Sequence, residues 1–306
     1  MSPGTPRVAV VDIGSNSVRL LLCTGWGPGG PAGERLSTVT GLRRGAGADG
    51  AIATDALARL DACLSAYAGR ARAFDPERVA AVGTSAVRDA PNRESVAEVV
   101  RARLGVELEV LSGDEEARLA FAGARLGAPG DGPIMVVDIG GGSTELVRGD
   151  ADGPTGAVSL QLGGTRQTER HLRSDPPLLA GLRALRAEAG ALVADGLAAI
   201  GGPAPAVGVA GTITTLAAID IGHYDPHLVH GHLLTRASVE RMTAELCVMP
   251  VARRAEVPGL DPARAPTIAG ASLIVCAVME TARLNEMTVS ERDLLDGLAT
   301  RYLAHP

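Results

Sequence analysis

Apolar residues occur along this chain in two patterns, short continuous runs and helical spacing. The runs Val8–Val11 and Ile134–Val137 are each followed by a polar, Gly-rich turn and then by a second apolar run. Short runs bounded by turn residues are typical of buried strands. In residues 51–72, by contrast, apolar residues recur at helical intervals, which predicts a helix. The two patterns alternate along the chain, so we expect an α/β fold.

One short stretch is present twice. Residues Val11–Leu20 read V-D-I-G-S-N-S-V-R-L, and residues Val137–Leu146 read V-D-I-G-G-G-S-T-E-L. Aligned without gaps, the copies share Val, Asp, Ile, Gly, Ser and the closing Leu. Each copy predicts a hairpin in which an Asp ends the first strand beside a Gly-rich turn. Two such hairpins about half a chain apart predict a duplicated architecture with the active site in the cleft between its halves.

Each turn has the composition of a phosphate-binding loop. Successive backbone N–H groups in a Gly-rich turn form a concave anion site, and Gly lets a ligand approach the backbone closely. The residues expected to contribute backbone or hydroxyl donors are Gly14, Ser15, Asn16 and Ser17 in the first copy, and Gly140, Gly141, Gly142, Ser143 and Thr144 in the second.

Asp12 and Asp138 would repel a phosphate that they contacted directly. They fit a site in which a hard divalent cation, Mg2+ or Mn2+, lies between carboxylate and phosphate, because Mg2+ is held by one or two carboxylates together with substrate oxygens. The alternative is an ordinary hairpin turn with a solvated Asp. The two interpretations are balanced for one copy, and the matching second copy favours the metal–phosphate site.

The remaining segments predict further strands and helices, with Thr54 as a candidate N-cap. Polar residues 84–92 follow a predicted strand, at the edge where open α/β sheets bind ligands. Gly211 and Thr212 open a helix in a position suited to phosphate, or form a plain tight turn. Strands are expected at 36–42, 79–83, 109–111, 157–162, 207–209 and 288–290, and helices at 51–72, 94–104, 112–124, 178–200, 237–247, 266–284 and 293–303.

Two groups of polar residues have a structural explanation that is stronger than a functional one when each is considered alone. Glu115 and Glu116 follow Ser112 at a predicted helix start, where capping and the helix dipole favour acidic residues. His230 and His232 lack a third ligand nearby in the sequence, and zinc sites need three or four. Contacts in a loop or with a partner explain these two imidazoles better.

Composition excludes several classes of protein. All 29 basic residues are Arg, and no G-x-x-x-x-G-K-[ST] run exists, which excludes a P-loop enzyme. The net charge of −6 argues against nucleic-acid binding through a global basic field. Four widely spaced Cys argue against a structural zinc site and a disulfide scaffold. With no apolar signal core at Met1–Arg7 and no run of membrane-spanning length, we expect a cytoplasmic protein with no membrane contact.

Five motifs occur in order: D-I-G-S-N-S-V-R-L, G-T-S-A-V-R-D-A, S-G-D-E-E-A-R-L, D-I-G-G-G-S-T-E-L and G-V-A-G-T-I-T-T-L. Together they resemble the exopolyphosphatase/guanosine pentaphosphate phosphohydrolase family, part of the acetate kinase–sugar kinase–Hsp70–actin superfamily. The resemblance covers nearly the whole chain. It implies two duplicated actin-like, ribonuclease H-like domains with mixed β-sheets flanked by helices, without the C-terminal helical domains of longer members.

The resemblance also implies roles for individual residues. The catalytic carboxylate of the family lies in S-G-x-E-E-A-R, which assigns it to Glu116, with Glu115 second. Arg19 matches a family arginine near the scissile phosphate, and Arg88 matches the basic residue of T-S-A-x-R. The two repeated turns would be the phosphate-binding loops, with Asp12 and Asp138 near the Mg2+.

Hydrolysis of a terminal phosphoanhydride needs an in-line water, a base and cations that offset phosphoryl charge. We therefore expect Mg2+-dependent release of orthophosphate from inorganic polyphosphate. The alternatives are hydrolysis of guanosine pentaphosphate to the tetraphosphate, and a non-catalytic sensor of polyphosphate or an alarmone. No base-stacking aromatic stands out in the motifs, which favours polyphosphate, and a sensor has no need of Glu116. A sugar or acetate kinase would lack the two specific segments around Arg88 and Glu116.

The expected domains are 1–126 and 127–306, with the helix at about 293–306 packing back on the first. A homodimer is expected, although no motif specifies one. One motif departs from the family, since Ser159–Glu169 reads S-L-Q-L-G-G-T-R-Q-T-E where S-L-P-L-G-x-x-R-L-T-E is usual. Gly163, Arg166 and Glu169 persist, so we expect altered local packing rather than lost activity, with an effect on binding of the polyphosphate tail.

Overall fold

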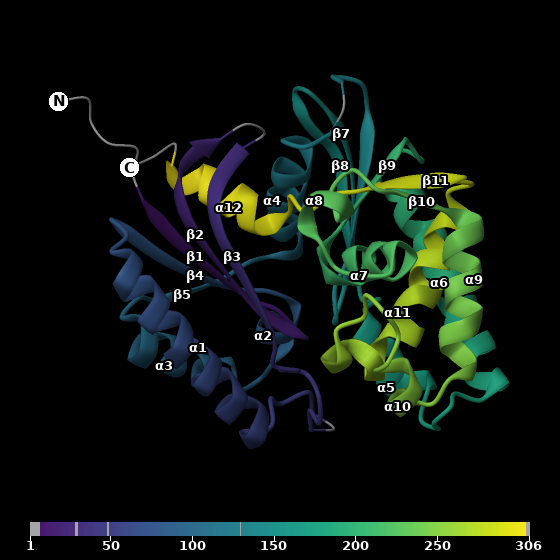
Figure 1. The fold of residues 1–306 in the computed structure, drawn as a ribbon, viewed down its shortest axis with the longest axis horizontal. Helices are drawn as coiled ribbons and strands as arrows, with labels where there is room; N and C mark the ends of the chain where they lie inside the picture. Colours follow the sequence, from purple (N-terminus) through teal and green to yellow (C-terminus); the bar gives the residue numbers. More distant parts are fainter. Residues whose placement is uncertain (1–6, 28–29, 48, 129, 304–306) are drawn as a thin grey trace. The chain divides into compact units, whose positions relative to one another are not determined.

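The computed structural model describes residues 7–27, 30–47, 49–128 and 130–303. The chain divides into two compact units (Figure 1). One unit contains the chain up to Gly127 together with the residues from Leu294 onward, and the other contains Ala128–Asp293. Each unit is built on its own β-sheet with its own hydrophobic core.

The first unit has a five-stranded mixed sheet with the strand order β3-β2-β1-β4-β5. β1 pairs antiparallel with β2 and parallel with β4, so it lies at the centre of the sheet. Every residue of β1 is buried, as its continuous apolar run predicts. The strands are β1 (Val8–Ile13), β2 (Ser17–Gly27), β3 (Gly30–Val39), β4 (Arg78–Gly83) and β5 (Leu108–Val110).

The second unit repeats this arrangement. Its six-stranded sheet has the order β10-β11-β9-β6-β7-β8, in which β8, β7, β6, β9 and β11 take the places of β3, β2, β1, β4 and β5, and β10 adds an edge strand. The prediction of two duplicated α/β units with mixed sheets is therefore confirmed. The strands are β6 (Ile134–Ile139), β7 (Thr144–Asp150), β8 (Gly153–Leu160), β9 (Ala206–Val209), β10 (Leu233–Thr235) and β11 (Glu286–Val289).

Helices cover both faces of the first sheet, because alternate residues of a strand point to opposite faces. Ala9 and Val11 belong to the core shared with α1 (Thr54–Phe74) and α3 (Arg93–Leu104). Their neighbours Val8 and Val10 belong to the core shared with α4 and α12, on the other face. Burying one Leu or Val side chain in such a core stabilises the fold by roughly 1.5–3 kcal/mol. The other helices of this unit are α2 (Ser85–Asp89), α4 (Gly113–Arg125) and α12 (Leu294–Leu303).

The second unit has one large core that includes residues of all three long helices, α6, α9 and α11. α11 is buried along most of its length and contacts α5, α6 and α9. The helical segments are α5 (Gly164–His171), α6 (Leu179–Ala199), α7 (Ala210–Ile221), α8 (Pro226–Val229), α9 (Arg236–Val248), α10 (Val251–Arg254), a short 3-10 helix (Pro262–Arg264) and α11 (Ala265–Thr281).

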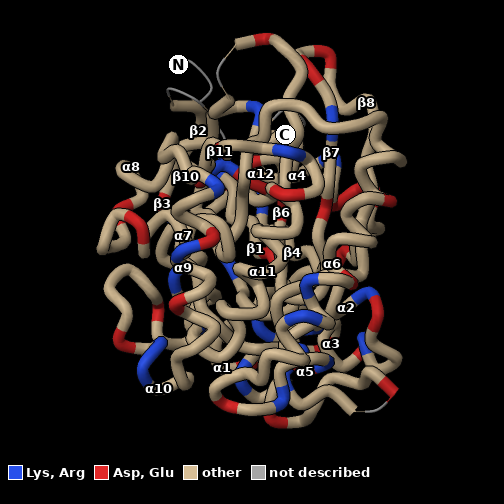
Figure 2. The backbone as a smooth tube through the Cα atoms, turned by 90° about the vertical axis from the view of Figure 1, so that its right-hand side faces the viewer, with Lys and Arg blue, Asp and Glu red and all other residues tan. Residues whose placement is uncertain are grey.

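Charged residues of both signs are interspersed along the helices and loops of each unit (Figure 2). Many form local ion pairs, such as Arg103 with Asp61 and Arg186 with Glu280. Exposed pairs of this kind contribute only about 0–1 kcal/mol each. None of the described helices is both long enough and apolar enough to cross a membrane.

One sequence-based prediction of local structure was wrong. Thr54 is the first residue of α1 rather than its N-cap, because Ala53 has the extended backbone of the cap position and no side chain caps this helix. The polar segment that follows β4 contains the short helix α2. His232 lies beside the Asp220 carboxylate, and His230 Nδ1 accepts a hydrogen bond from the Glu291 amide.

Candidate active site

Asp12 and Arg19 form a part-buried ion pair across the first hairpin. They face each other in the β1–β2 register, and Arg19 Nε and Nη2 donate to the same Asp12 oxygen at 2.9 and 2.6 Å. Asp12 is only 3% exposed. A buried carboxylate needs such a charge partner, so the repeated motif places an Arg beside the strand-end Asp in this unit.

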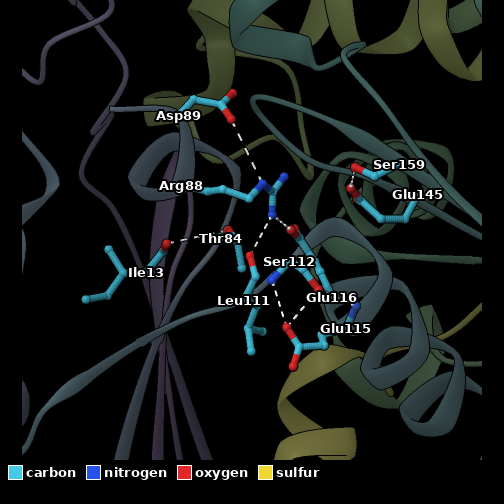
Figure 3. Close-up of polar contacts among 10 residues, drawn as sticks. All are labelled: Ile13, Thr84, Arg88, Asp89, Leu111, Ser112, Glu115, Glu116, Glu145 and Ser159. Atoms are coloured by element: carbon cyan, nitrogen blue, oxygen red, sulfur yellow. Dashed lines mark hydrogen bonds and ion pairs between the residues drawn. The ribbon is translucent and has the colours of Figure 1, made fainter. Parts of the chain in front are cut away.

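The start of α4 separates the roles of two adjacent acidic residues (Figure 3). Glu115 completes a capping box, because its carboxylate accepts hydrogen bonds from the backbone and hydroxyl of Ser112. Glu116 is buried and instead forms a 2.7 Å ion pair with Arg88 Nη1, which also donates to the Leu111 carbonyl. The capping explanation therefore applies to Glu115 and not to Glu116, whose carboxylate pairs with Arg88.

Burial raises the pKa of Glu116 to about 7, against the opposing effect of the Arg88 guanidinium. The negative charge of Asp12 raises this pKa further, and the positive charge of Arg19 lowers it. These four side chains therefore form one electrostatic group within the first unit. A carboxylate that titrates near neutral pH is suited to general acid–base catalysis. The hydrogen bonds from Ser112, by contrast, lower the pKa of Glu115.

The first Gly-rich turn is held through its carbonyl groups. The Ser15 carbonyl accepts from the Arg43 amide at 3.0 Å, and the Asn16 carbonyl accepts from the amides of Thr40 and Gly41 at 2.9 and 2.8 Å. In a trans peptide the N–H of the next residue points away from the C=O. The amides of Asn16 and Ser17 therefore face away from this support, as an anion-binding turn requires.

The second hairpin places two carboxylates opposite each other. Asp138 is the last residue but one of β6 and faces Glu145 on β7 in the strand register. Asp138 is 6% exposed and Glu145 is 1% exposed, and the Ser159 hydroxyl donates to Glu145 at 2.6 Å. Glu145 was not among the functional residues predicted from the sequence. The signal for it was present, because the repeat alignment places it opposite Asp138 as Arg19 lies opposite Asp12.

The start of α5 supports the second Gly-rich turn. The Gly140 carbonyl accepts from the Gly164 amide at 2.9 Å, and the Gly141 carbonyl accepts from the amides of Thr165 and Arg166 at 2.9 and 3.0 Å. A Cβ on Gly163 would lie 2.4 Å from the Gly141 oxygen, so this close approach requires glycine. The first turn of α5 thus supports the loop.

The other predicted phosphate-binding residues lie in the same unit. Gly211 is at the start of α7, where a Cβ would lie 2.4 Å from Arg264 Nη1, so a guanidinium lies against this glycine. Thr212 follows it and is buried. Thr144 is fully buried, and its hydroxyl donates its proton to the carbonyl of Leu162, which follows β8.

A divalent cation was predicted at Asp12 and Asp138. Over the described residues, no group of three or more His, Cys, Asp or Glu side chains could hold a metal ion. Mg2+ does not need such a cage, because it binds through one or two carboxylates together with substrate phosphates and water. The buried strand-end carboxylates are hard oxygen donors, so the donor set fits an ion that binds together with phosphate.

Comparisons with known proteins show similarity to one family over almost the whole chain. The model of the Ppx/GppA phosphatase family matches residues 34–305. Exopolyphosphatase 2 of Mycobacterium tuberculosis is 37% identical, over 96% of this chain and 97% of that protein. The crystal structure of an exopolyphosphatase-like protein superposes with a TM-score of 0.91 at 31% identity, covering 97% of this chain and 99% of that one. The family member from Aquifex aeolicus gives a TM-score of 0.80 at 28% identity, covering 98% of each chain.

Proposed function

The chain belongs to the Ppx/GppA phosphatase family, and from this premise we propose that it is an exopolyphosphatase. The reaction is Mg2+-dependent hydrolysis of the terminal phosphoanhydride bond of inorganic polyphosphate, with release of orthophosphate. The similarity to an exopolyphosphatase of M. tuberculosis along 96% of the chain supports this substrate.

The observation that carries the proposal is the buried Glu116 carboxylate. It is fixed by Arg88, and burial raises its pKa to about 7. Ionised Glu116 accepts a proton from the attacking water, while the oxygen of that water forms a bond to the terminal phosphorus. The bond to the bridging oxygen breaks, and the shortened polyphosphate leaves with the electron pair. A positioned base of this kind contributes about 10²–10⁴ to the rate.

Arginines and backbone amides bind the terminal phosphate in this proposal. Arg19 and Arg88 are part-buried cations within the same electrostatic group as Glu116. An Arg presents several N–H donors in a fixed geometry that suits phosphoryl oxygens. The two Gly-rich turns add N–H groups that are already oriented, so they need little reorganisation when charge develops on the phosphoryl group.

Asp12 and Asp138 are the residues proposed to hold Mg2+. A bound Mg2+ offsets negative charge on the phosphoryl oxygens and acts as a template for them. Because Arg19 already contacts Asp12 through one carboxylate oxygen, its interaction with Asp12 has to accommodate the ion. The same scheme accounts for two carboxylates at an anion site, which charge alone disfavours.

The direct test is orthophosphate release from polyphosphate of medium length by the purified full chain, with Mg2+ and with EDTA. We expect release with Mg2+ and none with EDTA. Guanosine pentaphosphate is assayed in parallel, since its terminal phosphoanhydride has the same chemistry. Cleavage of the pentaphosphate alone would replace the proposed substrate. Binding of either compound without turnover would reduce the protein to a sensor.

A further inference from the structure

Arg166 donates hydrogen bonds to the second Gly-rich turn from both its backbone and its side chain. Its backbone amide donates to the Gly141 carbonyl at 3.0 Å, and its side-chain Nε donates to the Gly142 carbonyl at 2.7 Å. Together with the amides of Gly164 and Thr165, it engages the carbonyls of all three glycines. Among the four groups that donate these hydrogen bonds, Nε of Arg166 alone belongs to a side chain.

The bond to Gly142 fixes the orientation of one peptide plane. The Gly142 carbonyl points toward Arg166, so the N–H of Ser143 in the same trans peptide points the opposite way. Glycine rotates more freely than any other residue. Without the guanidinium, the peptide plane between Gly142 and Ser143 would lose the hydrogen bond that it accepts from a side chain. Arg166 therefore holds the Ser143 amide in the direction that an anion at the turn requires.

The first turn is held differently. Its Ser15 and Asn16 carbonyls accept from the backbone amides of Arg43, Thr40 and Gly41. Removal of any one side chain there leaves these bonds in place. The second turn has Gly at the two positions that Ser15 and Asn16 occupy in the first. A mutation of Arg166 can thus remove one of the four hydrogen bonds that support the second turn without altering the backbone.

We propose that Arg166 is a positioning residue for the substrate phosphate, acting through the Gly142 carbonyl on the Ser143 amide. The inference rests on the proposed function, because the anion concerned is the phosphate of that substrate. The part-buried guanidinium also adds positive charge at the turn, which a negative ligand favours. Two substitutions separate these contributions, since Arg166→Ala removes both and Arg166→Lys keeps the charge but loses the planar N–H fork.

The matched control is Arg148→Ala. Arg148 lies on β7 in the same unit, and its Nη1 also donates to a backbone carbonyl, that of Gly201, at 2.6 Å. Steady-state hydrolysis of polyphosphate is measured for the wild type and the three variants. We expect kcat/KM to fall about 100-fold in Arg166→Ala and by a similar factor in Arg166→Lys. Arg148→Ala should stay within about twofold of the wild type, as surface substitutions usually do.

A second readout does not depend on turnover. Hydrogen–deuterium exchange of the peptide spanning residues 139–146 reports the opening of the turn. It should be faster in both Arg166 variants than in the wild type, and unchanged in Arg148→Ala. If Arg166→Ala does not fold, Arg166→Lys decides the matter by the same two measurements.

The outcomes separate this inference from the proposed function. A wild type that releases no orthophosphate contradicts the proposed function. Faster hydrogen exchange in the Arg166 variants would even then show that Arg166 stabilises the second Gly-rich turn. An active wild type with an equally active Arg166→Ala overturns the inference alone. Full activity in Arg166→Lys with loss in Arg166→Ala would show that the charge acts without the positioning, and would overturn it as well.

Discussion

The two Gly-rich hairpins have the same register but differ in the residue that faces the strand-end aspartate. Arg19 faces Asp12 in the first hairpin, whereas Glu145 faces Asp138 in the second. Opposite charges at directly opposed positions stabilise a pair of strands, and like charges destabilise it. The first hairpin therefore balances the charge of its own aspartate. The second places two carboxylates opposite each other, and on the proposed function a cation binds beside them.

This difference shows how a duplicated scaffold diverges in its chemistry. The first unit adds the Glu116–Arg88 pair to its hairpin, which provides an acid–base group near neutral pH. The second unit adds a carboxylate pair and a turn with three glycines. On the proposed function, the first unit supplies proton transfer, and the second supplies the stronger attraction for the cation that accompanies phosphate.

The largest effect is expected from Glu116→Gln, which removes the acid–base group of the first unit. The rate of orthophosphate release should fall about 10³-fold, because the amide cannot accept a proton from water. Glu115→Gln is the matched control one residue away, and should retain most of the activity since Glu115 serves the capping box. Equal losses in the two variants would contradict the separation of roles at the start of α4.

The next effect tests the second hairpin. Glu145→Gln should raise the Mg2+ concentration needed for half-maximal activity about tenfold, as losses around a metal site often do. Ser159→Ala removes only the hydroxyl that donates to Glu145, and should shift it less. An unchanged Mg2+ dependence in Glu145→Gln, with a large shift in Arg19→Gln, would show that the first hairpin and not the second has the stronger attraction for the cation.

The pH dependence of activity should follow the ionisation of Glu116. Its pKa of about 7 means that the ionised fraction rises about tenfold between pH 6 and pH 8. The pH profile of kcat should therefore rise over this range. A profile that is flat from pH 5 to pH 8 would exclude Glu116 as the titrating base.

The contribution of Glu116 to the stability of the fold should fall as the pH rises, whereas its contribution to activity should increase. The pKa of Glu116 rises from an ordinary 4.5 to about 7 on folding, so the folded protein binds this proton where the unfolded chain has lost it. The stabilisation linked to that proton is complete below pH 4.5 and is lost as the pH rises through 7. The melting temperature of Glu116→Gln minus that of the wild type should therefore be larger at pH 8 than at pH 5.

The smallest effect concerns the cap that orients α4. Ser112→Ala removes the hydroxyl that accepts from the Glu115 amide and donates to its carboxylate. Loss of an N-cap costs about 1 kcal/mol in the free energy of unfolding, which thermal or urea denaturation can measure. Activity should change little if Glu116 keeps its contact with Arg88. A loss of activity as large as that of Glu116→Gln would show that the cap positions the base.

The sequence predicted most of the fold because its signals are local. The apolar runs that became β1 and β6 are continuous and bounded by Gly, and the long helices show clear spacing. The short elements α8, α10 and β10 were not predicted, because three or four residues are too few to show a period. These elements are held by tertiary contacts such as the pairing of β10 with β11.

The candidate site was predictable only in part for the same reason. Glu115 and Glu116 are adjacent acids at one helix start, and the sequence alone favoured capping for both. Which acid closes the capping box and which meets Arg88 depends on the direction each takes from the helix. Arg166 was not among the predicted site residues, because its partner Gly142 lies 24 positions away in the sequence.

The last helix has a consequence for how the chain is made. α12 follows the whole second unit in the sequence, yet its residues Leu295 and Leu298 complete the core on one face of β1 and β2, and Asp296 pairs with Arg35 of β3. During synthesis, Val8 and Leu21 leave the ribosome long before the helix that covers them. The nascent first unit therefore exposes an apolar sheet face until α12 has been synthesised, and surface exposed in this way favours aggregation during folding.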